Sequence, residues 1–296
     1  MKINLKDIGK QANNVTYINN VLKLDNYIYK IKTNHDIYDY LHSKGFKHFL
    51  RPIETINNID KFNYIEEEII NESDKAIDLI HVLAYLQNKT TSYEEINLDK
   101  VKEKYEEILN NINYIYNYYY SLQDVIERKI YYNPSEYLLL INISLIYENL
   151  KLSKKLIDDY YNIIINKQTE RKVFIHGHLS LDHFIDNKDK VLISFKNMKK
   201  DLSIYDFIYF YKRHFEDLDM NYLFDIYQQR FTYTKDEMLL MLSNILLVDK
   251  ITIKDSSYQE YTKVKKLIEY IKGTKKFALN QYKKYKKDKN NELQEQ

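Results

Sequence analysis

The stretch RKVFIHGHLSLDHFID, residues 171–186, constrains the fold more than any other part of this chain. An apolar run from Val173 to Ile175 leads directly toward one of the four glycines of the sequence, and the stretch holds three of the eight histidines. Apolar runs that stop at a glycine are typical of a strand that enters a tight loop. The stretch therefore predicts a strand and a polar loop, followed by a turn at residues 186–189 and a second short strand.

Helical periodicity surrounds this loop on both sides. Apolar side chains recur every three to four positions in three segments: residues 71–89, 97–130 and 135–167. Ser73 is placed to cap the first of these helices, and Pro134 is placed to separate the other two. Helices are expected again from about residue 202 to about residue 285, with a break at residues 255–257.

The first seventy residues predict a mixture of strands and one short helix. Residues 16–33 alternate apolar and polar side chains around Leu24-Asp25-Asn26, which indicates a hairpin. Residues 35–45 predict a short helix that Gly45 ends. Two further strands are expected on either side of a turn at Asn57-Asn58, and Pro52 suits a strand start or a sheet edge.

Composition limits the classes of function that need to be considered. The chain has 296 residues, 44% of them hydrophobic, with 45 basic and 43 acidic residues and therefore a net charge of +2. This balance gives no argument for nucleic-acid binding. There is no cysteine, which excludes disulfides and thiolate metal sites. No signal peptide and no membrane span are expected, so we predict a cytoplasmic location.

Together these patterns predict an α+β fold in two lobes joined near residues 64–73. Residues 1–70 form a small β-containing N-lobe, and residues 71–285 form a larger, mainly helical C-lobe that carries the loop at 176–197 in a short hairpin. The charged residues 286–296 are expected to be a disordered tail.

The loop itself follows a recognisable spacing. His176, Gly177 and His178 are followed by His183 and then by Ile193-Ser194-Phe195. This order resembles the catalytic loop of aminoglycoside and choline phosphotransferases, His-Gly-Asp-x-x-x-x-Asn, which is followed after a turn by Ile-Asp-Phe. The resemblance implies a protein-kinase-like bilobal fold.

Other segments extend the resemblance in order along most of the chain. Asp206-Phe207 opens a run that ends at Lys212-Arg213 and is similar to one in the CotS-type spore coat branch of the same superfamily. Residues 83–87 resemble the family's Leu-Ala-x-Leu-His, and residues 63–65 resemble the start of its hinge. Lys30 stands where the family offers a lysine to ATP, although no glycine-rich loop is recognisable.

Three positions depart from the pattern that the chemistry requires. The family uses an aspartate for the attacking hydroxyl, and an asparagine and a second aspartate for Mg²⁺. In this chain these positions are His178, His183 and Ser194. Imidazole is a poor ligand for Mg²⁺, and a serine supplies no charge. The resemblance assigns loop-structuring roles to His176, Gly177 and Asp206, which are retained.

The sequence therefore predicts a pseudokinase, with no resident metal or cofactor, that acts through protein partners and by resemblance belongs with spore coat proteins. Three alternatives stay open. The chain is an atypical small-molecule kinase that uses His178, or it binds ATP through Lys30 without turnover, or its histidines hold zinc or nickel together with Asp182 or Asp186. The sequence names no substrate, no individual partner and no oligomeric state.

Overall fold

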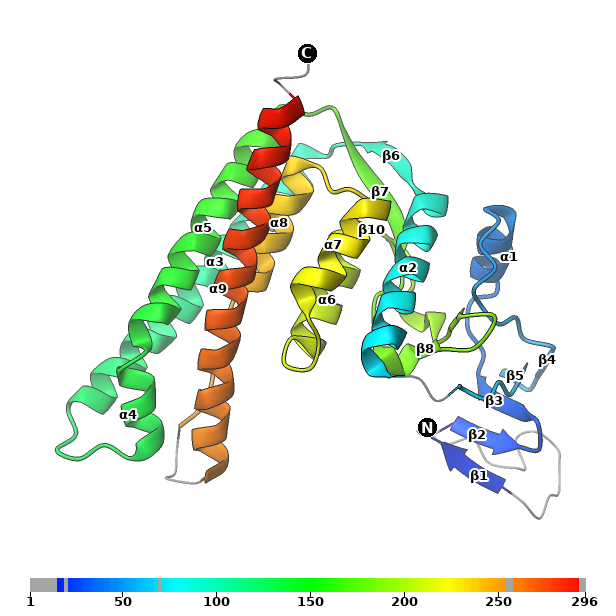
Figure 1. Ribbon diagram of the computed structural model, residues 1–296, viewed down its shortest axis with the longest axis horizontal. Helices are drawn as coiled ribbons and strands as arrows, with labels where there is room; N and C mark the ends of the chain where they lie inside the picture. Colours follow the sequence, from blue (N-terminus) through cyan, green and yellow to red (C-terminus); the bar gives the residue numbers. More distant parts are fainter. Residues whose placement is uncertain (1–14, 19–20, 69–70, 254–257, 293–296) are drawn as a thin grey trace. The chain divides into compact units, whose positions relative to one another are not determined.

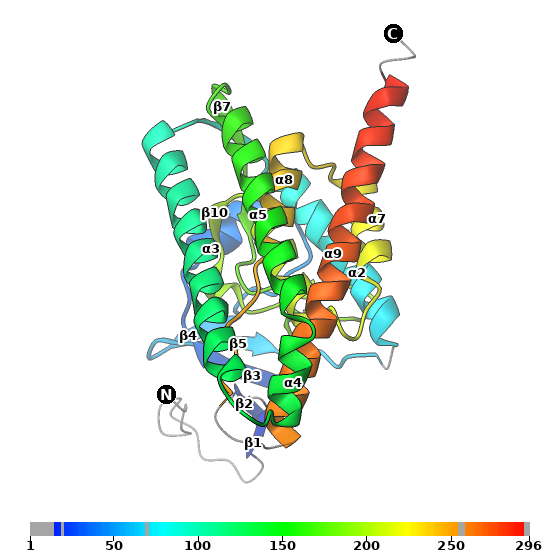
Figure 2. The same cartoon turned by 90° about the vertical axis from the view of Figure 1, so that its left-hand side faces the viewer.

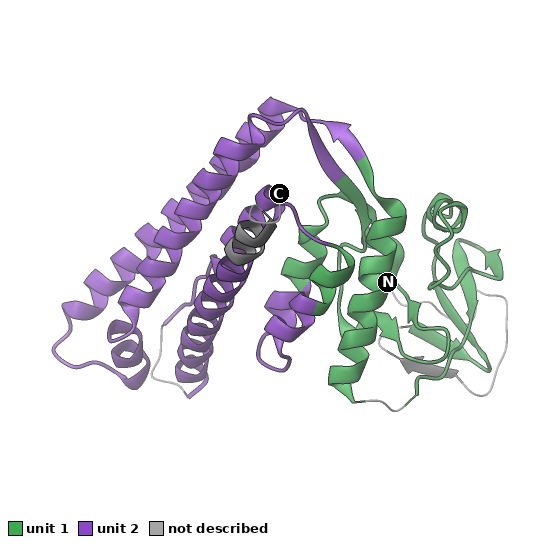
Figure 3. Ribbon diagram, turned by 45° about the horizontal axis from the view of Figure 1, so that its top comes forward, with its two compact units in different colours: residues 1–92, 172–209, 226–231 green, residues 93–171, 210–225, 232–296 purple. Residues whose placement is uncertain are grey.

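The computed structural model describes residues 15–18, 21–68, 71–253 and 258–292. The chain forms two compact units, coloured separately in Figure 3. The first unit holds residues 1–92, 172–209 and 226–231, and the second holds residues 93–171, 210–225 and 232–296. The lobe boundary that the sequence predicts near residues 64–73 stays a prediction, since the compact units group the chain by packing and place the loop 176–197 with the N-terminal strands.

The first unit contains an antiparallel five-stranded sheet in the order β1-β2-β3-β5-β4 (Figure 1). The strands are β1 Val15–Ile18, β2 Val21–Leu24, β3 Tyr27–Ile31, β4 Glu54–Ile56 and β5 Ile59–Asn63. Two tight turns connect β2 to β3 and β4 to β5. Asp25, Asn57 and Asn58 have positive φ in these turns, a conformation that Asp and Asn tolerate better than other side chains. Both predicted hairpins are confirmed.

The sheet buries a small apolar cluster and carries a short helix. Leu22, Leu24, Tyr29 and Ile59 pack together on one face of the sheet. The helix α1, Asp36–Ser43, ends as predicted, with Gly45 at φ 73° just beyond its C-cap. β4 is an edge strand, and Pro52 precedes it, so the missing N–H of this proline leaves no gap inside the sheet.

The helix α2, Glu72–Thr90, follows the sheet in the first unit, and its N-cap differs from the predicted one. Asn71 is the N-cap, and its side-chain oxygen accepts a hydrogen bond of 3.0 Å from the backbone N–H of Ser73. Asn71 has the extended backbone that an N-cap needs, whereas Ser73 lies inside the first turn. The predicted N-cap was wrong because Asn71 and Ser73 are both residue types that favour this position.

The predicted loop segment forms short strands joined by 3₁₀ turns. β7 spans Thr169–Ile175, β8 spans Phe184–Ile185, β9 spans Val191–Leu192 and β10 spans Lys199–Asp201. β8 and β9 pair in the expected hairpin. The sequence did not predict β10, which pairs with β7, or the third strand of that sheet, β6 Ser92–Glu95. Both are short and rich in charged residues, and so lack the apolar alternation of a recognisable strand.

Helices make up most of the second unit. Its main members are α3 Leu98–Glu127, α4 Pro134–Leu140, α5 Ile143–Ile164, α8 Lys235–Leu246 and α9 Tyr258–Glu292. α5 packs against α3, α8 and α9, and α4 packs against α9 (Figure 2). α6 Ile204–His214 and α7 Met220–Arg230 contribute residues to both units. None of the described helices combines the length and the apolar character that a bilayer crossing requires.

Several helix boundaries differ from the predicted ones. α3 stops at Glu127, and Pro134 begins α4 with a capping box of Asn133 and Glu136. A proline at the first helical position needs no hydrogen-bond partner, so it starts this helix and does not merely break the previous one. The predicted helix 135–167 is divided at Asn142 into α4 and α5. α9 continues beyond residue 285 to Glu292, because its last turns contain no glycine or proline. The predicted break at 255 to 257 and the last four residues lie outside the described residues.

Candidate functional site

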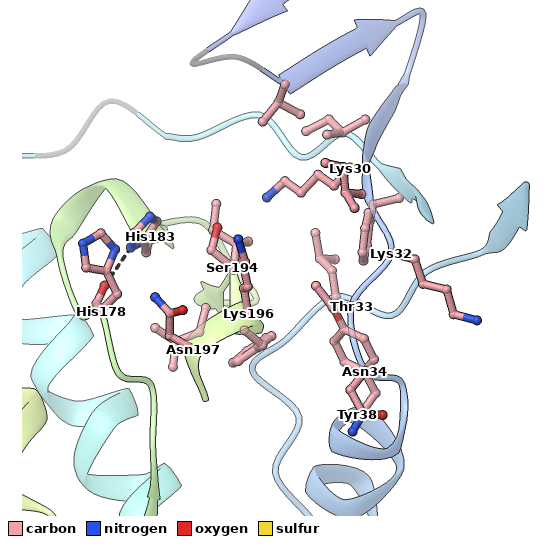
Figure 4. Close-up of a pocket in the computed structure, with 18 of the residues that line it drawn as sticks. Lys30, Lys32, Thr33, Asn34, Tyr38, His178, His183, Ser194, Lys196 and Asn197 are labelled. Atoms are coloured by element: carbon pink, nitrogen blue, oxygen red, sulfur yellow. Dashed lines mark hydrogen bonds between the residues drawn. The ribbon is translucent and has the colours of Figure 1, made fainter. Parts of the chain in front are cut away.

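The first compact unit contains a cavity of about 600 Å³. β3 and the segment after it form one wall, and the loop between β7 and β10 forms another (Figure 4). Four of the predicted residues line this cavity together: Lys30, His178, His183 and Ser194. The remaining lining residues are Val21, Ile28, Tyr29, Ile31, Lys32, Thr33, Asn34, Tyr38, Leu50, Phe62, Ile185, Leu192, Ile193, Phe195, Lys196 and Asn197.

The base of the loop is held by Asp206, at the start of α6. The backbone N–H groups of His176 and Gly177 each donate a hydrogen bond of 2.8 Å to its carboxylate. The His176 ring donates from Nε2 to the carbonyl of Ile193 at 2.8 Å, which ties the loop to the strand after the turn. His176 and Asp206 are 0% and 1% exposed. These bonds bring together, at the base of the loop, the three residues expected to structure it.

Gly177 makes the turn at the base of the loop. Its φ is +77°, in the region that disfavours side chains, and a Cβ at this position would overlap the backbone carbonyl oxygen of Asn197. Only glycine therefore fits without displacement of the segment that carries Asn197. The glycine at the end of the apolar run 173–175 is thus required by close backbone packing.

Burial sets the protonation of the two ionisable groups at the base. It lowers the pKa of His176 to about 4, so this ring is neutral near pH 7. It raises the pKa of Asp206 to about 6, although the N–H groups of His176 and Gly177 favour the carboxylate. Near neutral pH both groups are thus in the states that their hydrogen bonds need.

The histidines at the cavity edge form a different arrangement. His183 donates from Nδ1 to the carbonyl of His178 at 2.8 Å, the dashed line in Figure 4, so its neutral ring carries the lone pair on Nε2. Burial lowers the pKa of His183 and favours this neutral form. The His178 ring lies 5.0 Å from the His183 ring and 4.6 Å from the Tyr209 ring, centroid to centroid. Both histidines are half-buried.

Ser194 is the third residue of the cavity that the resemblance singles out. Its backbone is left-handed, with φ 72° and ψ 52°, immediately before the 3₁₀ turn Phe195–Asn197. Its hydroxyl brings a neutral oxygen to a place where the resemblance expects a carboxylate. A single neutral oxygen beside imidazole rings does not suit Mg²⁺, which is bound through carboxylates, phosphates and water.

Lys30 enters the cavity from the opposite wall, without an ion pair among the described residues. It pairs in the sheet with Asp60, but this buried carboxylate accepts hydrogen bonds from His35 Nε2 at 2.9 Å and Thr55 Oγ1 at 2.6 Å. Burial lowers the pKa of Lys30. A half-buried ammonium group with no anion beside it is a site of unfavourable desolvation.

Carboxylates are missing from the described lining. Asp182 and Asp186, the two substitutes that the sequence offered, do not line the cavity. Asp186 is buried elsewhere in the first unit, and burial raises its pKa. Among the residues that the structure describes, no group of three histidine, aspartate or glutamate side chains is placed to hold a metal ion. The described residues of this cavity therefore do not fit a divalent metal.

Sequence reasoning missed several polar residues of the cavity. Lys196 and Asn197 follow Ser194 by two and three positions, and Thr33, Asn34 and Tyr38 follow Lys30 closely. Their proximity in sequence to predicted site residues was the available signal. It was weak, because lysine, asparagine and tyrosine are abundant in this chain.

Comparison with known proteins shows which solved structures share the fold of this chain. No protein-family model matches the sequence, and no curated protein matches it. Among solved structures, the aminoglycoside phosphotransferase from Alicyclobacillus acidocaldarius is similar with a TM-score of 0.65, at 12% identity, over 95% of this chain and 96% of that one. The chain has the fold of an aminoglycoside phosphotransferase. The predicted fold class, α+β with a small β-containing N-terminal part and a larger helical C-terminal part, is confirmed.

Two further structures with this phosphotransferase fold match less closely. The AMP-bound spectinomycin phosphotransferase has a TM-score of 0.49 at 12% identity, over 88% of this chain and 92% of that one. The choline kinase LicA from Streptococcus pneumoniae has a TM-score of 0.42 at 14% identity, over 95% of each chain. At such identities the likeness concerns the fold alone.

Proposed function

We propose that this chain is a catalytically inactive protein with a phosphotransferase fold, a pseudokinase. The observation that carries the proposal is the absence of carboxylates among the described lining residues of the cavity, with His183 and Ser194 at the positions that the resemblance gives to Mg²⁺ ligands. Phosphoryl transfer depends on metal ions that neutralise the developing charge. Loss of one preorganised charge typically lowers a rate by about 10²-fold or more, and several are replaced here.

The intact hydrogen bonds at the base of the loop also support the proposal. Asp206, His176 and Gly177 keep their buried hydrogen bonds, so the altered residues are not part of a general collapse of the loop. A chain that retains the supporting bonds while the reactive positions change retains a folded surface.

A phosphotransfer assay tests this proposal. Purified protein is incubated with ATP and Mg²⁺ or Mn²⁺, in the presence of aminoglycosides, the acceptor class suggested by the similar structure with a TM-score of 0.65. We expect no release of ADP above that of buffer. Metal-dependent ADP release that His178→Ala abolishes would contradict the proposal and support an atypical kinase that uses His178 as its base.

We further propose that the protein acts through protein contacts, as a scaffold in the spore coat of a spore-forming bacterium. The spore assignment rests on the resemblance of residues 176–213. The turn after α3 supports a contact role, because Ile130 and Tyr131 are 89% and 88% exposed in the second unit. A fluorescent fusion in a spore-forming host should gather at the developing spore, and a signal that stays diffuse through sporulation would count against this role.

A further inference from the structure

We propose that the cavity binds a polyphosphate anion in its metal-free form, and that divalent cations weaken this binding. The inference rests on the proposed function in one respect, namely that no metal is needed for catalysis at the same cavity. It goes beyond it by naming the ligand chemistry and the sign of the metal effect.

Two ammonium groups approach the same space. The side chains of Lys30 and Lys196 extend into the region between β3 and the loop, whereas the ammonium group of Lys32 points away from it (Figure 4). Lys30 is half-buried on the strand, and Lys196 belongs to the 3₁₀ turn after Ser194. The cavity therefore offers positive charge from two opposite walls.

No described carboxylate neutralises these two charges. Asp60, the residue paired with Lys30 in the sheet, is engaged by His35, by Thr55 and by the backbone N–H of Thr33 at 3.2 Å. Neither lysine forms an ion pair among the described residues. An anion between them would gain Coulomb energy from both and would offset the desolvation that lowers the pKa of Lys30.

Neutral hydrogen-bond donors and an apolar surface complete the cavity. Ser194 and Asn197 line it with a hydroxyl and an amide, groups that can donate to phosphate oxygens. Val21, Ile28 and Phe62 line it with apolar side chains, which favour an organic group joined to the phosphates. This combination suits a chain of phosphates, and it suits a nucleotide better than inorganic phosphate alone.

The predicted metal effect follows from the same set of residues. A Mg²⁺ ion on a triphosphate cancels two of its negative charges, and so weakens its attraction to Lys30 and Lys196. In an active kinase, protein carboxylates compensate for this by binding the ion itself. Here the described lining residues provide no carboxylate, so the ion would bring charge repulsion without new ligands.

Calorimetric titration of the full chain tests the inference. ATP is titrated with EDTA present and then with excess Mg²⁺, and inorganic triphosphate is titrated under both conditions. We expect metal-free ATP to bind at least about fivefold more tightly than Mg·ATP. Tighter binding of ATP than of triphosphate identifies a nucleotide ligand, and equal affinities identify the phosphate chain; both outcomes support a metal-free polyanion site.

Matched lysine variants locate the binding. Lys30→Met and Lys196→Met should each weaken metal-free ATP by about tenfold, the usual effect of removing one charge-assisted contact. Lys188→Met removes the same charge at an exposed position of the same unit, outside the cavity lining, and should change the affinity less than about twofold. Because Lys196 is exposed, its variant tests the proposal even if the Lys30 variant unfolds.

Two results would overturn the inference. If neither polyphosphate binds without metal, or if Mg²⁺ tightens ATP binding without turnover, the metal-free site is wrong while the pseudokinase proposal stands. If Mg²⁺ both tightens binding and produces ADP, the proposed function fails as well. The two proposals therefore fail in distinguishable ways.

Discussion

The base and the cavity edge of one loop are subject to different physical demands. At the base, His176, Gly177 and Asp206 are joined by buried hydrogen bonds and by a backbone approach that leaves no room for a Cβ. At the edge, His178 and His183 are half-buried and contact each other through one hydrogen bond, from the His183 ring to the His178 carbonyl, and through their rings. Under the proposed function, the base residues are the ones that the resemblance retains, and the edge residues are the ones that it finds replaced.

The hydrogen bonds at the base do not involve the side chains of His178, His183 or Ser194. Each group at the base supports another part of the backbone, so a change there destabilises the fold. The edge residues face a cavity, where a side chain can change without leaving a buried donor unpaired. Substitutions at the base should therefore alter stability, and substitutions at the edge should mainly alter ligand binding.

The largest expected effect comes from Gly177→Ala. The substitution adds strain at φ +77° and places a methyl group against the Asn197 carbonyl, so we expect a loss of about 3 kcal/mol or more in unfolding free energy. Gly45→Ala is the matched control, because Gly45 has φ +73° but open space around it, and should lose only about 1 kcal/mol. Urea denaturation measures the unfolding free energy of both variants. Equal losses would show that the close approach to the Asn197 carbonyl adds no destabilisation.

Asp206→Ala should have the next largest effect. It leaves the buried N–H groups of His176 and Gly177 without their acceptor, and we expect a loss of about 2–4 kcal/mol. Asp206→Asn retains one acceptor oxygen and should lose less. Urea midpoints at an unchanged m-value would report these losses, and an Ala variant as stable as the parent would mean that the base does not depend on this carboxylate.

Acid should affect the base in two opposing ways. The pKa of His176 is lowered to about 4, so its contribution is complete above pH 6.5 and is lost as the pH falls toward 4, by about 3 kcal/mol. The pKa of Asp206 is raised to about 6, so its contribution changes in the opposite sense and stability is gained as the pH falls from 6 toward 3.8. The two effects largely cancel in the parent protein.

Asp206→Asn removes one side of this balance. The variant should therefore lose stability more steeply than the parent between pH 6.5 and pH 4, with a difference of about 2 kcal/mol at the acid end. Urea midpoints of both proteins at several pH values provide the measurement. Parallel curves would show that the carboxyl of Asp206 titrates normally and does not compensate for His176.

The sequence predicted most of the fold because the local signals were strong. The turns at Asp25 and at Asn57-Asn58 need left-handed backbone, and their residue types indicate it directly. The cap of α2 was misplaced because Asn71 and Ser73 both suit an N-cap, and only the hydrogen bond to Asn71 decides between them. β10 was missed because its residues, Lys199 to Asp201, are recognisable as a strand only through their pairing with β7.

The sequence could predict the candidate site residues that lie close together in one loop, but not the contacts between distant segments. His178, His183 and Ser194 could be singled out because they occupy spaced positions in one loop. Lys30 and Lys196 line the same cavity because β3 faces this loop in the fold. No local sequence pattern predicts that arrangement. The missing neutralisation of Lys30 depends in turn on His35 and Thr55, whose bonds to Asp60 are set by the fold of the sheet.

The smallest change in stability should come from restoring the edge. In the triple variant His178→Asp, His183→Asn and Ser194→Asp, each new side chain faces the cavity, and aspartate tolerates the left-handed backbone at position 194. We therefore expect the unfolding free energy to change by less than about 1 kcal/mol.

The new carboxylates of this triple variant should reverse the metal effect, so that Mg²⁺ tightens ATP binding, whereas it weakens ATP binding in the parent. Titrations with and without Mg²⁺ would show this reversal. A stable variant that still prefers metal-free ATP would mean that the geometry of the edge, as well as its residue types, has departed from a working kinase.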